Sequence, residues 1–242
     1  MWSIYIKEIN SFLDSLIAYI VIGVFLTGIG LLMWVFPETS VLDYGFADMT
    51  TLFALGPYVF MFLIPAITMR TFSEEKRAGT IELLMTRPLT EWSIIMGKYL
   101  SSFTLVLFSI LPTAIYYFSI YKLGNPEGNL DTAGIVGSYI GLALLGAVFT
   151  AIGVLSSSLT ENQIVAFIIA VFFCFIFYSG FASFASINVW QSSSLFIEKL
   201  GILYHYTSMS KGLIDSRDLI YFFSVITIML LITHMILSSR KW

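Results

Sequence analysis

Six long apolar stretches without a formal charge decide what this chain can fold into. Crossing the hydrocarbon core of a bilayer takes about 20 apolar residues at a rise of ~1.5 Å each. Backbone polar groups in lipid must bond within their own segment, so each stretch is expected to form a helix. The stretches are 16–36, 51–69, 99–121, 134–159, 164–184 and 219–237. They predict an all-α integral membrane protein, with six transmembrane helices in a single domain over residues 1–242.

The composition agrees with a membrane location. The chain is 58% hydrophobic and 11% charged, whereas an ordinary soluble domain is roughly 25% charged. Three prolines fall inside the stretches, Pro57, Pro65 and Pro112, and neighbouring helices tolerate such prolines as kinks. The first stretch lacks a basic leader and a small-residue cleavage site, so no cleavable signal peptide is expected.

The distribution of lysine and arginine predicts the orientation, because cytoplasmic loops are enriched in these residues. Six crossings put both termini on one side, with Lys7, Arg70, Lys76, Arg77, Arg87, Lys98, Arg240 and Lys241. The opposite side holds Lys122, Lys199, Lys211 and Arg217. The first loop on that side, residues 37–49, carries acidic charges only. We therefore expect a multi-pass protein of the inner (cytoplasmic) membrane with both termini in the cytoplasm.

The leader, residues 1–14, is expected to be an amphipathic interfacial helix. Apolar side chains recur in it at intervals of mostly three or four residues: Trp2, Tyr5, Ile9, Phe12, Leu13 and Leu16. Lys7, Glu8, Ser11 and Asp14 occupy the other positions. Such a helix suits the headgroup layer of the inner leaflet. The alternative is a cytosolic extension of the first crossing.

The connection 185–218 is too apolar for a simple loop. Phe196, Leu200 and Leu203 are expected to share a helical face, and Val189, Trp190 and Tyr204 add apolar bulk. These features indicate a helix on the outer surface or a re-entrant segment protected by protein.

The fourth apolar stretch carries small residues at four-residue spacing. Gly137 and Gly141 form a GxxxG motif, and Ala143 and Ala147 continue the pattern. Small residues let helices approach closely in lipid. The motif predicts helix packing, either within the chain or between two chains.

No catalytic, cofactor-binding or metal-binding residue can be assigned from the sequence. His205 and His234 lack the spacing of metal ligands and are expected to be hydrogen-bonded at helix interfaces. Cys174 is expected to be a small residue facing lipid or another helix. No glycine-rich phosphate loop and no basic run for nucleic acid is present. No charge lies within the predicted crossings, which argues against an ion-coupled carrier.

The loop 70–98 concentrates nine of the chain's 27 charged residues. Within it, Gly79 is expected to break the chain and Thr80 to cap a short helix, which Pro88 limits to about two turns. Ile81, Leu84 and Met85 then share one face, whereas Glu82 points elsewhere. Thr90 is expected to cap a second helix that leads into the third crossing.

Two turns of helix are not stable alone, so the apolar face is expected to insert into the groove of a partner. Charged residues would form a polar rim around this contact: Glu74, Glu75, Lys76, Arg77 and Arg87. The alternative is an ordinary solvated loop that obeys the positive-inside rule.

The pattern R-x-F-x-E-E-x-x-x-G-T-I-E-L-L-x-x-x-P-L-T, followed by G-K at 97–98, resembles the cytoplasmic loop of ABC-2-type ABC transporter permeases. The leader, the six crossings and the long outer connection resemble that family over nearly the whole chain. The segment from Tyr204 to Phe222 is similar to the subfamily of the gliding-motility permease GldF. That subfamily also resembles permeases assigned to copper-site maturation and sodium export.

The resemblance implies that Thr80–Thr86 is a coupling helix that docks on a cytosolic ATPase, with Glu74 and Glu75 at its approach. The leader would be the family's connector helix. The docking residues so implied are Glu74, Glu75, Arg77, Gly79, Thr80, Ile81, Glu82, Leu84, Met85 and Arg87. ATP and Mg would be bound by the ATPase, and a second permease chain would complete the transporter.

The sequence thus predicts a non-catalytic permease subunit that couples ATP hydrolysis in a partner to export or to force transmission across the membrane, in gliding motility among other roles. Its expected partners are ABC ATPase subunits, a second permease chain and membrane lipid, and no nucleic acid. A stand-alone membrane scaffold or channel without an ATPase is the alternative, and a membrane enzyme is a third.

Overall fold

The computed structural model describes residues 1–85, 89–186 and 194–239, with Ile17, Tyr44, Leu83 and Met85 described by their backbone alone. Every regular element in these residues is helical. The elements are α1 (Trp2–Leu13), α2 (Leu16–Trp34), α3 (Val41–Tyr44), α4 (Thr50–Thr68), α5 (Ser73–Arg77), α6 (Ile81–Met85), α7 (Glu91–Ile110), η1 (Leu111–Thr113), α8 (Ala114–Leu123), α9 (Thr132–Leu159), α10 (Gln163–Phe175), η2 (Ile176–Gly180), α11 (Phe181–Ala185), α12 (Ser194–Lys199), α13 (Ile202–Met209) and α14 (Ser216–Ser238).

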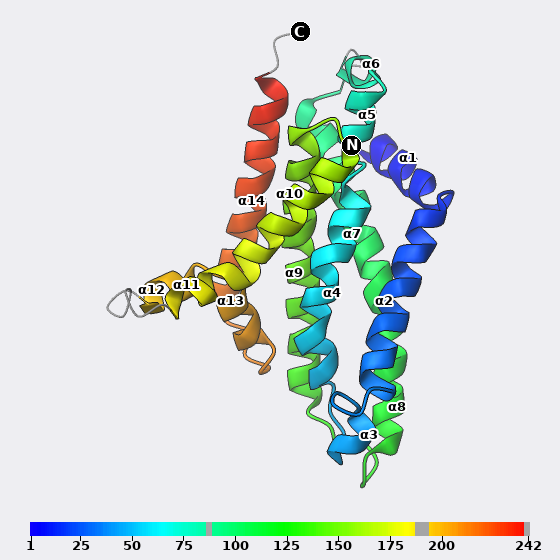
Figure 1. Cartoon of the computed structure of the whole chain (residues 1–242), viewed down its shortest axis with the longest axis vertical. Helices are drawn as coiled ribbons and strands as arrows, with labels where there is room; N and C mark the ends of the chain where they lie inside the picture. Colours follow the sequence, from blue (N-terminus) through cyan, green and yellow to red (C-terminus); the bar gives the residue numbers. More distant parts are fainter. Residues whose placement is uncertain (86–88, 187–193, 240–242) are drawn as a thin grey trace.

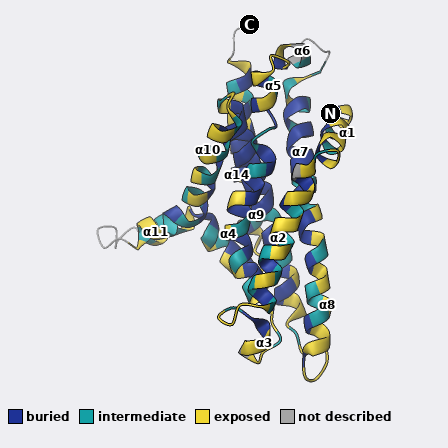
Figure 2. Ribbon diagram, turned by 45° about the vertical axis from the view of Figure 1, so that its right-hand side comes forward, coloured by how far each residue is buried: buried dark blue, intermediate teal, exposed yellow. Residues whose placement is uncertain are grey.

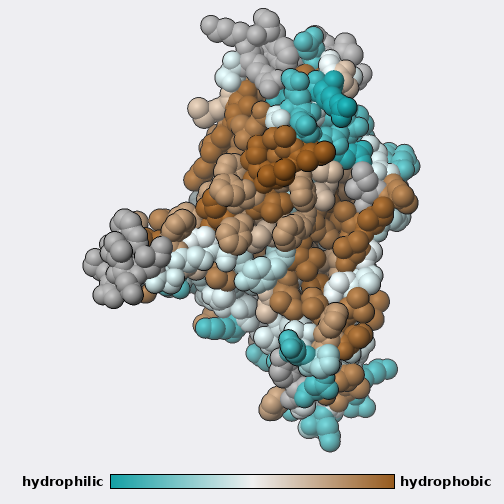
Figure 3. All heavy atoms as spheres, viewed as in Figure 1, coloured by the Kyte–Doolittle hydropathy of each residue, from teal (hydrophilic) through white to brown (hydrophobic). Residues whose placement is uncertain are grey.

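Five helical stretches are long and apolar enough to cross a membrane: Thr50–Arg77, Glu91–Leu123, Thr132–Leu159, Gln163–Ala185 and Ser216–Ser238. The other predicted crossing corresponds to α2, which follows α1 after a bend of 67° and makes a sixth span if the bent pair is counted as one. Figure 3 shows a hydrophobic surface over the middle of the molecule and hydrophilic residues gathered towards its two ends.

The two ends of the bundle carry different elements (Figure 1). One end, called the α6 end below, holds α5, α6, α1 and the end of α14. The other, called the α3 end, holds α3 and the end of α8. The segments expected on the cytoplasmic side therefore lie together at the α6 end.

Helix α9 forms the centre of the bundle, and most of its side chains are buried (Figure 2). It packs against α4, α7, α10, α13 and α14. Small residues allow these close approaches. A Cβ at Gly146 would lie 2.8 Å from Val106, and a Cβ at Gly137 would lie 2.8 Å from the carbonyl oxygen of Met209.

The GxxxG motif packs within the chain. Gly137 and Gly141 both face α13, Ala147 is buried, and Ala143 is partly buried against the core. Of the two predicted uses of this motif, the structure shows packing within the chain.

The third predicted crossing, 99–121, is part of a longer helical stretch, and this stretch starts where the second cap was expected. Helix α7 starts at Glu91, where the hydroxyl oxygen of Thr90 accepts a hydrogen bond from the Ser93 N–H at 3.3 Å, as expected for an N-cap. The helix continues through a 3₁₀ turn at Pro112 into α8. Lys98 thus lies two turns inside a spanning helix and is buried. Lys98 directly precedes the predicted crossing 99–121, and its burial in the same helix was not predicted.

The predicted outer segment is helical but broken. Gly201 has an extended backbone (φ −83°, ψ 144°) and ends α12 before α13 begins. The predicted common face of Phe196, Leu200 and Leu203 is therefore wrong, because its residues belong to different elements. Instead Ile202, Tyr206 and Met209 of α13 face the core; Val189 and Trp190 lie outside the described residues.

The leader is helical, as predicted, and one of its faces is buried against the bundle. Ile4, Glu8 and Phe12 point into the protein, whereas Trp2 and Leu13 are exposed. Helix α1 packs against α7, where a Cβ at Gly97 would lie 2.9 Å from Ile4. The burial of Glu8 was not predicted, and it is explained by its partner on α7.

We predict that Gly153→Ala destabilises the protein by about 1–3 kcal/mol, because overpacking a close helix contact has that cost. A Cβ at Gly153 would lie 2.7 Å from Cβ of Thr68, whose hydroxyl is held by a hydrogen bond to the Ile64 carbonyl oxygen at 2.9 Å. Gly23→Ala is the matched control, since no atom lies within 4 Å of its Cβ position. Thermal unfolding of the purified variants in detergent measures the difference; equal melting temperatures would contradict the close contact.

Candidate functional site

The predicted docking segment forms two short helices at the α6 end (Figure 1). Gly79 joins α5 to α6 with φ of +67°, in the left-handed region that glycine adopts without strain. Glu82 is exposed, as expected, but Ile81 is only 4% exposed and Leu84 is half-buried against the core. Ile81 is thus covered by its own chain, and Leu84 keeps part of its surface free.

The remaining predicted docking residues differ in exposure. Those exposed at the α6 end are Glu74, Arg77, Gly79 and Thr80. The side chain of Met85 and the whole of Arg87 lie outside the described residues.

Lys98 is the centre of an ion cluster, formed with Glu8, Glu75 and Lys7. Its Nζ lies 2.9 Å from Oε1 of Glu8 and 3.0 Å from Oε1 of Glu75. Nζ also donates a hydrogen bond to the Thr71 carbonyl oxygen at 2.6 Å and lies 5.2 Å from the ring centroid of Phe72. The side chain is 1% exposed. All three N–H groups of the ammonium therefore have acceptors, the condition under which a buried charge is tolerated.

Lys7 completes the ion cluster at its exposed side. Its Nζ lies 3.4 Å from Oε1 of Glu75 and 3.7 Å from Oε1 of Glu8, and its side chain is 61% exposed. Two lysines and two glutamates thus balance in charge. Glu75 was predicted to lie on the rim of the docking surface, but its carboxylate turns inward because Lys98 attracts it.

A second set of contacts fixes α5 to the end of α9. The hydroxyl oxygen of Ser157 accepts hydrogen bonds from the N–H groups of Phe72 at 2.9 Å and Ser73 at 3.0 Å. The same hydroxyl donates to the Met69 carbonyl oxygen at 3.0 Å. Lys76, another predicted rim residue, is buried and donates to the carbonyl oxygen of Ser158. The turn between α4 and α5 is therefore held from one side by α9 and from the other by the ion cluster.

A third contact joins α7 to α14 at the same end. Nε2 of His234 lies 3.2 Å from Oε2 of Glu91, and its ring stacks on Trp92 at a centroid distance of 4.9 Å. The Ser238 hydroxyl donates to the same Glu91 oxygen at 2.6 Å. His234 therefore has partners at a helix interface, as expected. The contacts at the α6 end join five helices: α1, α5, α7, α9 and α14.

The ion cluster was missed because each of its charges stands at the edge of an apolar stretch. Glu8 was expected on the polar side of an interfacial helix, Lys98 at the end of the cytoplasmic loop, and Glu75 on the rim of the docking surface. One signal could have revealed part of the cluster: Ile4, Glu8 and Phe12 share a face at i, i+4 and i+8, so a single carboxylate interrupts an apolar stripe. Such a carboxylate needs a buried partner.

The other titratable groups form no catalytic arrangement in the described residues. Nδ1 of His205 lies 2.7 Å from Oδ1 of Asp218, and its Nε2 lies 2.9 Å from the carbonyl oxygen of Lys199, so this histidine also has partners. Cys174 is buried against neighbouring helices. The pKa of Asp215 is lowered, chiefly because the N–H of Arg217 donates a hydrogen bond to its carboxylate. Within the described ranges, no group of three or more His, Cys, Asp or Glu side chains could hold a metal ion.

We predict that Lys98→Met destabilises the protein by about 3–5 kcal/mol, because it leaves the carboxylates of Glu8 and Glu75 buried without their cation. Lys7→Met is the matched control. It removes a cation from the same cluster, but at an exposed site where an ion pair contributes about 1 kcal/mol or less. Thermal unfolding in detergent separates the two. A similar shift for both variants would show that burial of Lys98 does not determine the stability of the cluster.

Comparison with known proteins agrees with this architecture. A protein-family model described as ABC-2 family transporter protein matches residues 2–239, from the start of α1 to just beyond α14. A search among curated proteins finds no match. Proteins of this family are membrane components of ABC transporters, typically non-catalytic subunits that work with ABC ATPase subunits. The apolar helices identify the chain as a multi-pass membrane protein. Because the family model matches nearly the whole chain, this protein belongs to the ABC-2 family of transporter proteins.

Proposed function

We propose that this chain is the permease subunit of an ATP-binding cassette transporter and that separate cytosolic ATPase subunits dock on α5 and α6. The ion cluster is the observation that carries the proposal. A solvated loop needs no buried attachment to the bundle, whereas α5 is attached to α1 and α7 through Glu75 and Lys98. The ATPase subunits would bind ATP and Mg, whereas this chain would bind neither.

The attachments define how a push on α5 and α6 would travel. Glu75 passes a displacement of α5 to Lys98 on α7 and, through it, to Glu8 on α1. Ser157 receives the same displacement on α9 through its hydrogen bonds to the start of α5. Motion is transmitted because packed helices move as rigid units about such contacts. In this mechanism the ATPase tilts α4 and α7 relative to their neighbours.

The docking surface is proposed to be the exposed side of α5 and α6. Glu74, Arg77 and Glu82 are exposed there, and Leu84 contributes a partly free apolar side chain. A small apolar contact inside a charged rim is a common arrangement of protein interfaces. Ile81 supports the short helix from below by packing into the core.

The wider assignment is part of the same proposal. The α6 end faces the cytoplasm of a cell with an inner membrane, and a second permease chain, identical or related, completes the translocation unit. The complex exports a substrate or transmits force to an outer partner, with gliding motility, as in GldF, as one such role. The alternative is a scaffold or channel that works without an ATPase.

We predict that wild-type protein, tagged and purified from its native membranes in mild detergent, retains a subunit that hydrolyses MgATP. For the variant that combines Arg77→Glu with Leu84→Asp, we expect the copurified ATPase activity to be about tenfold lower than for wild type, or lower still. The reason is that central interface residues carry most of the binding energy. The measurement is ATP hydrolysis per mole of tagged chain.

Two controls make this test specific. Arg217→Glu repeats the charge reversal at an exposed site away from α5 and α6, and Leu84→Met keeps the apolar surface; both are expected to retain the ATPase. Wild-type protein without any retained ATPase would favour the scaffold or channel. Full retention by the double variant would refute docking at α5 and α6.

A further inference from the structure

A cavity of about 540 Å³ lies towards the α3 end, between α4, α9, η2 and α13. Its size falls within the range of small-molecule sites, roughly 300–1,000 Å³. The lining residues that matter here are Phe53, Tyr58, Tyr178, Tyr206, Asp48 and Asp131. They come from four separate parts of the sequence, and the ion cluster lies at the other end of the bundle.

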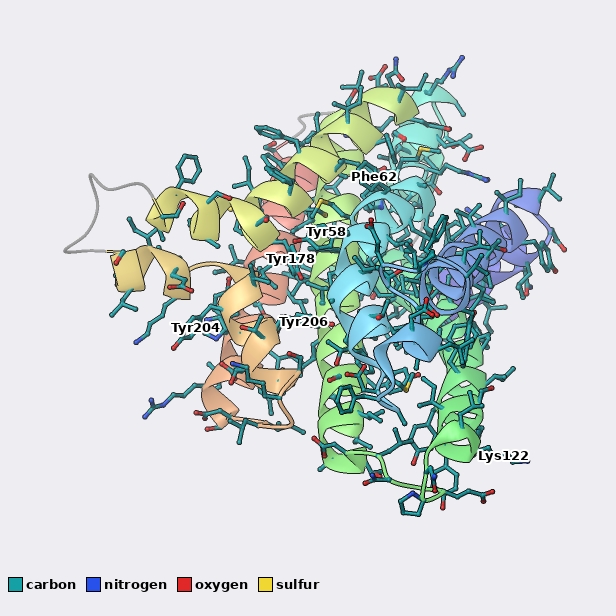
Figure 4. All side chains as sticks on the ribbon, turned by 60° about the horizontal axis from the view of Figure 1, so that its bottom comes forward. Tyr58, Phe62, Lys122, Tyr178, Tyr204 and Tyr206 are labelled. Carbon is teal, nitrogen blue, oxygen red and sulfur yellow. The ribbon has the colours of Figure 1, made fainter. Side chains whose placement is uncertain are left out.

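Aromatic rings form one part of the cavity wall. Tyr178 stands edge-on to Tyr58 at a centroid distance of 5.6 Å and lies 6.3 Å from the ring of Tyr206. Figure 4 shows these three tyrosines together between α4, η2 and α13, whereas Phe62 lies farther along α4 and Lys122 on α8. Tyrosine rings attract organic cations through their electron-rich faces.

Two of the tyrosine hydroxyls remain free for a ligand. The Tyr206 hydroxyl donates to the Phe53 carbonyl oxygen at 2.7 Å. Tyr178 as a residue is only 2% exposed, and within the described part of the chain neither its hydroxyl nor that of Tyr58 makes a hydrogen bond. Neither hydroxyl is among the fully buried oxygens that lack a partner, so water or a ligand can reach both.

Two carboxylates, those of Asp48 and Asp131, lie at the exposed edge of the cavity. Asp48 accepts hydrogen bonds from the N–H of Thr50 at 2.7 Å and from its hydroxyl at 2.9 Å. Asp131 accepts one from the N–H of Gly134 at 3.0 Å, as the N-cap of α9. The donors of these hydrogen bonds are neutral, so both carboxylates keep their negative charge. No described lysine or arginine lines the cavity or forms an ion pair with either carboxylate. Lys211 follows the lining residue Ser210 in sequence but does not itself line the cavity.

We propose that this cavity binds an amphipathic organic cation, with its apolar part among the tyrosines and its positive charge within the field of Asp48 and Asp131. These two carboxylates have no ion-pair partner among the described residues, so they disfavour the phosphate and carboxylate headgroups of anionic lipids. The aromatic wall in turn disfavours a small hydrated metal cation and favours an organic one. If the proposed transport function holds, this class of molecule is the cargo; binding itself does not depend on an ATPase.

The test uses tetraphenylphosphonium and tetraphenylborate, which have nearly the same shape and opposite charge. Binding to the purified chain is measured by equilibrium dialysis in a neutral detergent, with protein-free micelles subtracted. We expect the cation to bind and the anion not to bind. Asp48→Asn combined with Asp131→Asn keeps acceptor oxygens for the local hydrogen bonds, and we expect it to weaken cation binding by roughly fivefold for each carboxylate.

Matched variants separate a local effect from a general one. Asp43→Asn combined with Glu127→Gln removes the same charge from α3 and from the loop before α9, outside the lining, and is expected to bind like wild type. Tyr58→Ala removes a ring that is 46% exposed, and we expect weaker cation binding without a loss of thermal stability. Equal binding of the two ions, or equal binding by the two double variants, would overturn the proposal. Since no ATPase is present, failure here would leave the docking of α5 and α6 untouched, and failure of docking would leave this site untouched.

Discussion

The buried ammonium of Lys98 is the interaction on which the α6 end of this protein depends. Removing an ion from water costs several kcal/mol even after relaxation of the surrounding protein. That cost is offset only while Glu8, Glu75 and the Thr71 carbonyl oxygen remain in place. The three segments that supply them are therefore coupled in position, because a separation of any one exposes or unpairs a charge. The short helix α5 gains stability from this attachment, whereas α6 gains it from the packing of Ile81 into the core.

The central helix α9 provides the second constraint, through its small residues. Gly146 and Gly153 let α7 and α4 approach its backbone, and Gly137 does the same for α13. In a membrane such contacts depend on close packing, because lipid tails solvate apolar side chains about as well as other side chains do. Ser157 adds hydrogen bonds at one end of the same helix. One helix thus positions elements at both ends of the bundle.

The apolar stretches predicted the helices well, because the length and the lack of charge of a spanning segment are properties of the local sequence. The cap at Thr90 and the break at Gly79 were predictable for the same reason. The ion cluster was not, since a charge at the edge of an apolar stretch is compatible with either water or a buried partner. The cavity depends on Tyr58, Tyr178 and Tyr206 meeting from three helices, and no local pattern contains that information.

The two ends of the protein are connected by the same rigid elements. Helix α4 leads to Thr71 and Phe72 beside the ion cluster, and it carries Phe53 and Tyr58 in the cavity wall. Helix α9 holds the start of α5 through Ser157 and carries Gly134 and Ser138 in that wall at its other end. When a rigid helix tilts, both of its ends move. A change in the angle between α4 and α9 at the α6 end would therefore also change the width of the cavity. In the proposed mechanism, a push at α5 and α6 would therefore reach the cavity at the α3 end through α4 and α9.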